Sequence, residues 1–380
     1  MPLNKVLILT NPLNHEGGVV NYYNLFFKHF KSNTITLKHG SIGSRAYLFY
    51  YPVLKRLLYP FYYLFDLLMY TIRLIFDRQI KIVQVSPSLI PVPLIRDGLL
   101  VIIAKILGKK VVVFYRGWKL PTYRKIEKYT KIRKLFNYVF QKNTLQIVLA
   151  SAFKNDLIKL NPGGGLKIQV TTTVIDKNQI IPKKKKDNFE TINVLFLARI
   201  QNLKGIGELI DAICKLKENN QLYKFNFTIV GHEYEPGYIN LLQDKLEAAN
   251  ITQDQVIFTG RKIDKEKFKI YAQNDIYLLP SYTEGCPNSV LEALSAGLFC
   301  ITTNVGALDD IIIDKENGLK IKKKSVDHIV NALNFCANNK SVLLRSDKIS
   351  KESIQQFDVK EIVATFNSIY MSLIYPKPNI

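Results

Sequence analysis

Residues 281–297 read SYTEGCPNSVLEALSAG and follow an apolar run, DIYLL, that is typical of a buried strand. Pro287 suits the first turn of a helix, because the N–H that proline lacks has no partner there, and the final glycine is a typical helix end. The stretch therefore predicts a strand, a loop that holds Glu284, and a helix that holds Glu292. The free N–H groups at the start of such a helix attract an anion, and we expect the two carboxylates to accept hydrogen bonds from hydroxyl groups.

A second stretch, ARIQNLKGIGELI (198–210), also follows a predicted strand and opens a predicted helix. Arg199 lies at the strand end, and Lys204 lies just before the helix. Arginine offers a planar fork that matches phosphate oxygens, and lysine supplies a point charge. A ligand with a diphosphate between two polyols would satisfy these cations, the helix start and the carboxylates, and a nucleotide sugar is such a ligand.

Short runs rich in β-branched residues alternate with helical segments along the whole chain, which predicts parallel sheets with helices on both faces. The runs lie at 6–10, 80–86, 109–115, 145–151, 192–199, 225–231, 255–260, 275–281 and 298–304. The fold class is therefore α/β, with two doubly wound, Rossmann-like domains and a cleft between them. We place the domains at 1–182 and 187–358, joined by a solvated linker at the lysine run PKKKKDN, and we expect a final helix at 360–380 to pack back on the first domain.

Charge and cysteine usage bound the class of partner and the compartment. Lys and Arg outnumber Asp and Glu by 53 to 31 among 380 residues, a formal charge of +22. Such an excess favours anionic partners, although solubility alone is an alternative explanation. The four cysteines form no close pair, and the first residues lack the apolar core of a secretory signal, so we expect a cytoplasmic protein.

Two segments predict contact with an anionic membrane surface. The stretch 46–76 is crowded with Tyr, Phe and Leu, but charged residues interrupt it too often for a membrane span. It suits a helix that lies in the interface, and a helix buried in the domain is the alternative. The segment 116–134 carries eight basic residues and one acid, which favours anionic headgroups, or else forms an ordinary basic helix face.

The two site stretches together resemble glycosyltransferase family 4, retaining enzymes of the GT-B fold that act in bacterial surface-polysaccharide synthesis. VIFTG (256–260) and NVGALDDII with NGL (304–319) fall in the order that the family shows. HEGGVVNY (15–22) matches the family's glycine-rich loop after the first strand. The resemblance is specific from about residue 192 to 320 and weaker before that.

The resemblance implies a role for each matching residue. Arg199 and Lys204 would hold the donor diphosphate, Glu292 would accept from the ribose hydroxyls, and Glu284 would face the donor sugar near the reacting centre. Glu284, Arg199 and Lys204 are thus the implied catalytic groups. Further implied donor contacts are Gly17, Gly18, Phe258, Gly260, Gly285, Cys286, Asn288 and Ser289. Transfer would be retaining, from a UDP- or GDP-sugar, with neither a metal ion nor another cofactor.

The acceptor side departs from the family pattern. Many members carry a histidine where YRGW (115–118) has Arg116, and an arginine cannot act as a base. We expect Arg116 to contact a phosphate or an anionic acceptor, with Trp118 and His15 as further candidates on this side. Arg116 and Trp118 as a packing pair, and His15 as an ordinary loop residue, are the alternatives.

The resulting expectation is a sugar transferase for capsule, lipopolysaccharide or a similar polymer, peripheral on the inner face of the plasma membrane and acting on a lipid-linked or oligosaccharide acceptor. A nucleotide-sugar epimerase of the same fold is one alternative. A nucleic-acid-binding protein is another, but the basic residues are not interleaved with base-stacking aromatic residues, so we expect no nucleic acid as a partner.

Overall fold

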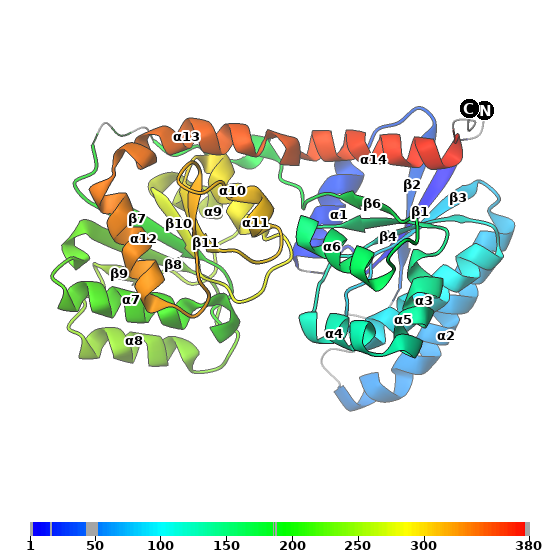
Figure 1. Cartoon of the computed structure of the whole chain (residues 1–380), viewed down its shortest axis with the longest axis horizontal. Helices are drawn as coiled ribbons and strands as arrows, with labels where there is room; N and C mark the ends of the chain where they lie inside the picture. Colours follow the sequence, from blue (N-terminus) through cyan, green and yellow to red (C-terminus); the bar gives the residue numbers. More distant parts are fainter. Residues whose placement is uncertain (1–2, 16, 43–51, 185, 187, 377–380) are drawn as a thin grey trace. The chain divides into compact units, whose positions relative to one another are not determined.

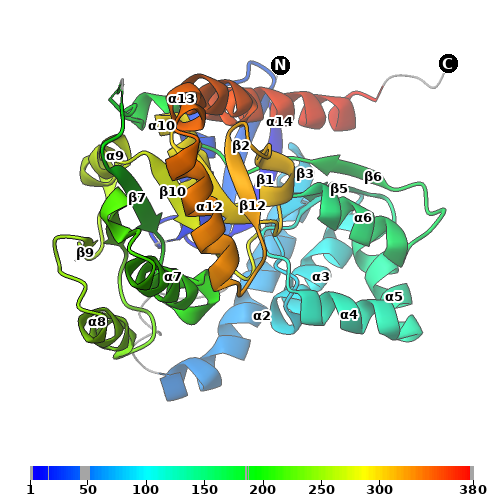
Figure 2. The same cartoon turned by 60° about the vertical axis from the view of Figure 1, so that its left-hand side comes forward.

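The computed structural model describes residues 3–15, 17–42, 52–184, 186 and 188–376. The chain divides into two compact units, with Met1–Val174 and Val359–Ile380 in unit 1 and Ile175–Asp358 in unit 2. In each unit a six-stranded parallel sheet is covered by helices on both faces, as Figures 1 and 2 show. The predicted α/β class and two doubly wound units are confirmed, and the cleft between them stays a prediction.

The sheet of unit 1 has the strand order β2-β1-β3-β4-β5-β6. Its central strands are almost wholly apolar and buried, as expected where helices cover both faces. The order reverses at β1, so the carboxyl ends of β1 and β3 flank the position where doubly wound sheets bind ligands. The strands are β1 (Asn4–Thr10), β2 (Ile35–Ser41), β3 (Ile80–Val85), β4 (Lys110–Phe114), β5 (Thr144–Val148) and β6 (Lys167–Val170). The helices are α1 (Gly18–His29), α2 (Pro52–Phe76), α3 (Pro91–Ile106), α4 (Leu120–Lys128), α5 (Thr130–Phe136), α6 (Ser151–Leu160) and α14 (Val359–Ile374), with a π-helical turn at Asn137–Gln141.

The sheet of unit 2 has the order β12-β11-β10-β7-β8-β9 and reverses between β7 and β10. The strands are β7 (Ile192–Leu197), β8 (Phe225–Val230), β9 (Val256–Phe258), β10 (Ile276–Leu279), β11 (Phe299–Thr303) and β12 (Gly318–Ile321). The helices are α7 (Ile206–Glu218), α8 (Tyr238–Ala248), α9 (Asp264–Gln273), α10 (Asn288–Ala296), α11 (Leu308–Ile311), α12 (Val326–Asn338) and α13 (Ser341–Ser353), with 3₁₀ turns at Lys177–Gln179, Asn202–Lys204, Leu222–Lys224 and Gln355–Phe357.

The last helix, α14, belongs to the core of unit 1. The Phe366 ring lies 5.1 Å from that of Phe26 on α1 and 5.6 Å from that of Phe114 on β4, measured between ring centroids. The Tyr370 hydroxyl donates a hydrogen bond to the Gln84 side chain at 2.7 Å. These contacts tie the C-terminal helix to two strands and a helix from the first third of the chain.

The lysine run is not a solvated linker. The N–H of Lys183 donates to the Ala296 carbonyl at 2.8 Å, its ammonium lies 3.2 Å from the Leu343 carbonyl, and Lys186 pairs with Asp275 at 2.7 Å. The partners of these two lysines are carbonyl oxygens and a buried carboxylate, and all of them lie in unit 2. The boundary lies instead between Val174 and Ile175.

The aromatic segment forms one long helix where the structure describes it. Residues 46–51 lie outside the described residues, and α2 begins at Pro52. Among the described residues, no helix combines the length and the apolar character that crossing a membrane requires.

Candidate active site

The turn after β7 is fixed by a glycine and carries Lys204 to the end of β10. Gly205 has φ of 71°, and a Cβ atom there would lie 2.1 Å from the Pro280 carbonyl oxygen, so no larger residue fits. The N–H of Tyr282 donates to the Leu203 carbonyl at 3.0 Å. The loops after the two strands that flank the switch point are therefore held against each other.

Lys204 and Glu284 form an ion pair at this point. The Lys204 ammonium lies 2.5 Å from Glu284 Oε1, and the two side chains are only 16% and 9% exposed. Two residues that the sequence assigns to one site are thus in direct contact, although 80 positions separate them. A lysine that is held by one carboxylate and sits at the carboxyl end of a parallel sheet is suited to receive a phosphate oxygen.

The loop that holds Glu284 is buttressed by the loop after β11. Gly306 has φ of 57°, and a Cβ atom there would lie 2.3 Å from the Glu284 carbonyl oxygen. The N–H of Ala307 donates to the Gly285 carbonyl at 2.8 Å, and the Thr303 hydroxyl donates to the Ser281 carbonyl at 2.5 Å. The carboxylate therefore projects from a loop whose backbone is fixed from behind.

Helix α10 starts directly after this loop. Pro287 is the residue before the helix rather than its first residue, because its ψ of 122° is extended, and Gly297 ends the helix with φ of 92° as predicted. The N-cap residue Pro287 makes no side-chain hydrogen bond to the first turn, and the dipole at this end attracts an anion. The predicted contacts Gly285, Cys286, Asn288 and Ser289 lie in this loop and first turn.

Glu292, inside α10, is held by two donors that sequence reasoning missed. The Lys267 ammonium lies 2.7 Å from Oε1, and the Tyr271 hydroxyl donates to Oε2 at 3.1 Å. Burial, and then the charge of Glu292, raises the pKa of Tyr271 well above its usual value, so the tyrosine stays a donor. Both contacts lie on α9, and no motif in the sequence links that helix to Glu292. The carboxylate is thus fixed in place and keeps lone pairs for further donors.

Arg199 is an exposed residue that follows the carboxyl end of β7. Its guanidinium carbon is 4.9 Å from the centre of the Tyr234 ring, a cation–π distance. Among the described residues, none accepts a hydrogen bond from it. The arginine therefore keeps its donors for a ligand.

Phe258 ends β9, two strands from β7, and the Gly260 carbonyl accepts from the N–H of Gly231 at 3.1 Å.

The remaining predicted residues lie in unit 1. Gly17 and Gly18 begin α1 directly after the β1 loop, and a Cβ atom at either would meet no atom within 4 Å, so a ligand can approach the backbone there. His15 is a half-buried residue of the same loop. Trp118 packs in the core of unit 1: its ring stacks on Phe153 at 4.7 Å, and it is 8% exposed.

Arg116 follows β4 and lies over aromatic rings. Its guanidinium carbon is 4.0 Å from the centre of the Tyr22 ring and 4.7 Å from that of Phe114. Nε and Nη1 are buried and have no hydrogen-bond partner among the described residues. The Arg116 side chain thus packs on the Tyr22 and Phe114 rings, and its buried Nε and Nη1 can still donate to an acceptor. The assigned roles of all these residues stay predictions.

A family model and several curated relatives match part of this chain. The sequence model of the family described as "Glycosyl transferases group 1" matches residues 176–355. An uncharacterized glycosyltransferase from Haemophilus influenzae is 25% identical over 52% of this chain and 54% of its own length. The "UDP-Gal:alpha-D-GlcNAc-diphosphoundecaprenol alpha-1,3-galactosyltransferase" of Escherichia coli is 25% identical over 42% of this chain and 40% of its own. The chain thus spans about half the length of the curated relatives it matches.

A solved structure shows the same fold over the whole chain. The crystal structure of a glycosyltransferase from Rickettsia africae covers 99% of this chain and 100% of its own, with a TM-score of 0.77 and 15% identity. This likeness confirms the predicted GT-B fold class. Residues 176–355, which make up nearly all of unit 2, match the sequence model of the group 1 glycosyl transferases.

Proposed function

We propose that the protein transfers a sugar from a nucleoside-diphosphate sugar to a lipid-linked glycan in the synthesis of a cell-surface polysaccharide. The carrying observation is the Lys204–Glu284 pair at the switch point of unit 2, in the loop that precedes the start of α10. The group 1 family domain supports the reaction class. The name of the E. coli relative, which specifies a UDP-sugar and a diphosphoundecaprenol acceptor, supports the substrate classes.

The leaving diphosphate is the group that this site would stabilise. Arg199 brings unpaired donors, Lys204 exchanges its carboxylate for a phosphate oxygen, and the first turn of α10 points N–H groups at the same region. Preorganised donors aimed at a developing negative charge are worth about 3–4 kcal/mol each in other enzymes. Glu284, once released from the lysine, accepts a hydrogen bond from a hydroxyl of the donor sugar.

Glu292 is proposed to bind the nucleoside part of the donor. Lys267 and Tyr271 hold its carboxylate in a fixed orientation, and the ribose hydroxyls donate to its remaining lone pairs. Gly17 and Gly18 are proposed as backbone contacts of the donor, since the space in front of both is open. Phe258 and Gly260 are proposed to border the base.

Transfer is proposed to retain the anomeric configuration and to need no metal ion. The anomer of the product, read by NMR before mutarotation, tests the first point. Activity that persists in excess EDTA supports the second, and activity that returns only with added Mg²⁺ or Mn²⁺ contradicts it.

Peripheral binding to the cytoplasmic face of the membrane is proposed for unit 1. Helix α2 buries Asp66, Tyr70 and Leu74 but exposes an apolar stripe at helical spacing. The stripe comprises Phe61, Leu64, Phe65, Leu68, Ile72, Ile75 and Phe76, each at least 37% exposed. An amphipathic helix of this kind lies in the interface plane, and the exposed basic side chains of α4 and α5 suit anionic headgroups.

A thermal-shift panel of UDP-, GDP-, ADP- and CDP-sugars tests the proposal. A donor at 100 times its dissociation constant stabilises the protein by about 2.7 kcal/mol. The stabilising donor is then incubated with a polyprenyl-diphosphate glycan, and the elongated lipid is identified by mass spectrometry. A changed nucleotide sugar without acceptor indicates an epimerase instead, and the absence of any stabilising donor contradicts the proposal.

A further inference from the structure

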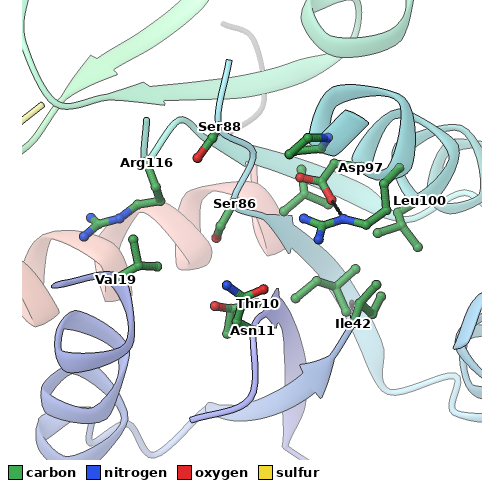
Figure 3. Close-up of a pocket in the computed structure, with 13 residues that line it drawn as sticks. Thr10, Asn11, Val19, Ile42, Ser86, Ser88, Asp97, Leu100 and Arg116 are labelled. Atoms are coloured by element: carbon green, nitrogen blue, oxygen red, sulfur yellow. Dashed lines mark hydrogen bonds and ion pairs between the residues drawn. The ribbon is translucent and has the colours of Figure 1, made fainter. Parts of the chain in front are cut away.

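A small pocket with both polar and apolar lining residues lies in unit 1, beside the carboxyl ends of β1, β3 and β4. Its volume is about 140 Å³, well below the roughly 300–1,000 Å³ of pockets for drug-sized ligands. Figure 3 shows Arg116 at one end and Asp97 at the other, with Ser86 and Ser88 between them and Thr10 and Asn11 below. The volume limits the occupant to about one sugar ring or a group of similar size.

One end of the pocket is suited to bind an anion. The Arg116 guanidinium is held over the Tyr22 and Phe114 rings, and its buried Nε and Nη1 have no acceptor among the described residues. A buried donor without a partner is costly, and a buried cation more so. Carboxylates and phosphates match the guanidinium fork with two parallel hydrogen bonds.

The other end of the pocket is suited to bind a group that donates a hydrogen bond. Asp97 is 3% exposed, and its Oδ1 accepts from Arg96 Nε at 2.6 Å. Its second oxygen, Oδ2, is buried and lacks a donor among the described residues. In Figure 3 one oxygen of the Asp97 carboxylate points toward the side of the pocket that holds Ser88. A hydroxyl group of a ligand would satisfy it.

The wall between the two ends is suited to a polyol. Within the described residues, no partner binds the hydroxyls of Thr10 and Ser88 or the side-chain amide of Asn11, and all three line the pocket. Each of these groups both donates and accepts, which matches sugar hydroxyls. Val19, Ile42 and Leu100 supply the apolar part of the lining, against which the C–H face of a sugar ring packs.

We propose that this pocket binds one acidic sugar unit, a pyranose whose hydroxyls meet Asp97 and Ser88 and whose carboxylate or phosphate is held by Arg116. In the proposed transferase this unit is part of the glycan acceptor, and that assignment rests on the proposed function. The binding of an acidic sugar does not rest on it. The chemistry shared by a uronate and a sugar phosphate is an anionic group beside ring hydroxyls.

The test compares three sugars on the full chain by isothermal titration or ligand-observed NMR. The probes are methyl glucuronide, glucose 6-phosphate and neutral methyl glucoside. We expect at least one anionic sugar to bind at least tenfold more tightly than the neutral one, and the preferred anion tells a uronate from a phosphate. Arg116→Gln should weaken that binding at least tenfold. Arg78→Gln, an exposed arginine at the amino end of β3, is the matched control and should leave it unchanged.

Three results would overturn the inference: equal binding of neutral and anionic sugars, unaltered binding in Arg116→Gln, or no binding of any probe. If Arg116→Gln does not fold, Arg116→Lys and Ser88→Ala replace it, and each should weaken acidic-sugar binding severalfold with the melting temperature preserved. Donor binding is measured on the same wild-type preparation. Acidic-sugar binding without donor binding would defeat the proposed function alone, and the converse would defeat this inference alone.

Discussion

Replacing Lys204 by alanine should lower both the stability of the ligand-free protein and its affinity for the nucleotide sugar, and the two effects can be measured separately. Lys204→Ala leaves the Glu284 carboxylate without its partner in a place where only 9% of that side chain is exposed. Exposed ion pairs contribute about 0–1 kcal/mol, and breaking a fully buried pair costs about 3–5 kcal/mol. For this pair we expect a loss of about 2–3 kcal/mol, between these limits.

A double-mutant cycle measures that coupling. Lys204→Ala and Glu284→Ala each leave one charge unpaired, whereas the double variant leaves none, so its loss should be close to that of a single variant rather than to the sum. In a unit of this size, about 2–3 kcal/mol lowers the melting temperature by roughly 4–12 °C. Lys215→Ala breaks a pair with Asp327 of similar length on the exposed surface of the same unit and should leave the melting temperature unchanged.

The same variants report on the donor. Lys204→Ala and the double variant should both lose the stabilisation that the nucleotide sugar gives to the wild type, because the phosphate cation is missing from both. A double variant that is about as stable as either single variant and still does not bind the donor is the expected pattern. Strictly additive losses, or a donor shift that survives in Lys204→Ala, would refute the reasoning that the lysine serves first the carboxylate and then the phosphate.

Three further changes test the fold and the surface. Gly205→Ala should lower the free energy of unfolding more than Gly237→Ala, measured in urea, because both cost about 1–2 kcal/mol for the left-handed backbone but only the first drives a Cβ atom into a carbonyl oxygen. Phe65→Ser with Leu68→Ser on α2 should weaken flotation with anionic vesicles at least tenfold, since each buried apolar side chain contributes about 1.5–3 kcal/mol; undiminished flotation would show that the stripe does not contact the membrane. Burial lowers the pKa of Lys105 to about 8, so the folded state binds fewer protons than the unfolded state between about pH 8 and 10.4. The wild type should therefore gain stability relative to Lys105→Met as the pH rises through this window, and a constant difference between unfolding at pH 7 and pH 10 would contradict the assignment.

The interior of both sheets could be predicted from the sequence, and three of their four edges could not. The apolar runs of the central strands indicate burial on both faces of the sheet, and for this reason the sequence predicts β1, β3, β4 and β5. The strands that the pattern missed are β2, β6 and β12, and each is the outermost strand of its sheet. An edge strand such as ITLKHGS is half-solvated and mixes polar with apolar residues, so its sequence lacks the signal.

The candidate site shows the same division between local and distant information. Local signals predicted the loop of Glu284 and the helix of Glu292, since proline and glycine mark its two ends. Long-range partners left no signal: Lys267 and Tyr271 hold Glu292 from another helix, and nothing in their spacing points to it. Ion pairs of this kind depend on which helix packs beside which, and that is a property of the fold.

The position of Arg116 is where the structure adds most to the sequence. The family resemblance marks it as a departure, and chemistry excludes an arginine as a base, but neither says what replaces the missing function. The structure supplies two facts, a guanidinium clamped on the Tyr22 ring and a carboxylate oxygen of Asp97 without a donor across the same small pocket. Packing does not explain buried guanidinium nitrogens and a buried carboxylate oxygen that lack hydrogen-bond partners among the described residues, because an apolar residue would be cheaper to bury at either position. Their joint occurrence is explained by a ligand that carries both an anion and a hydroxyl group, and an acidic sugar is the simplest molecule that does.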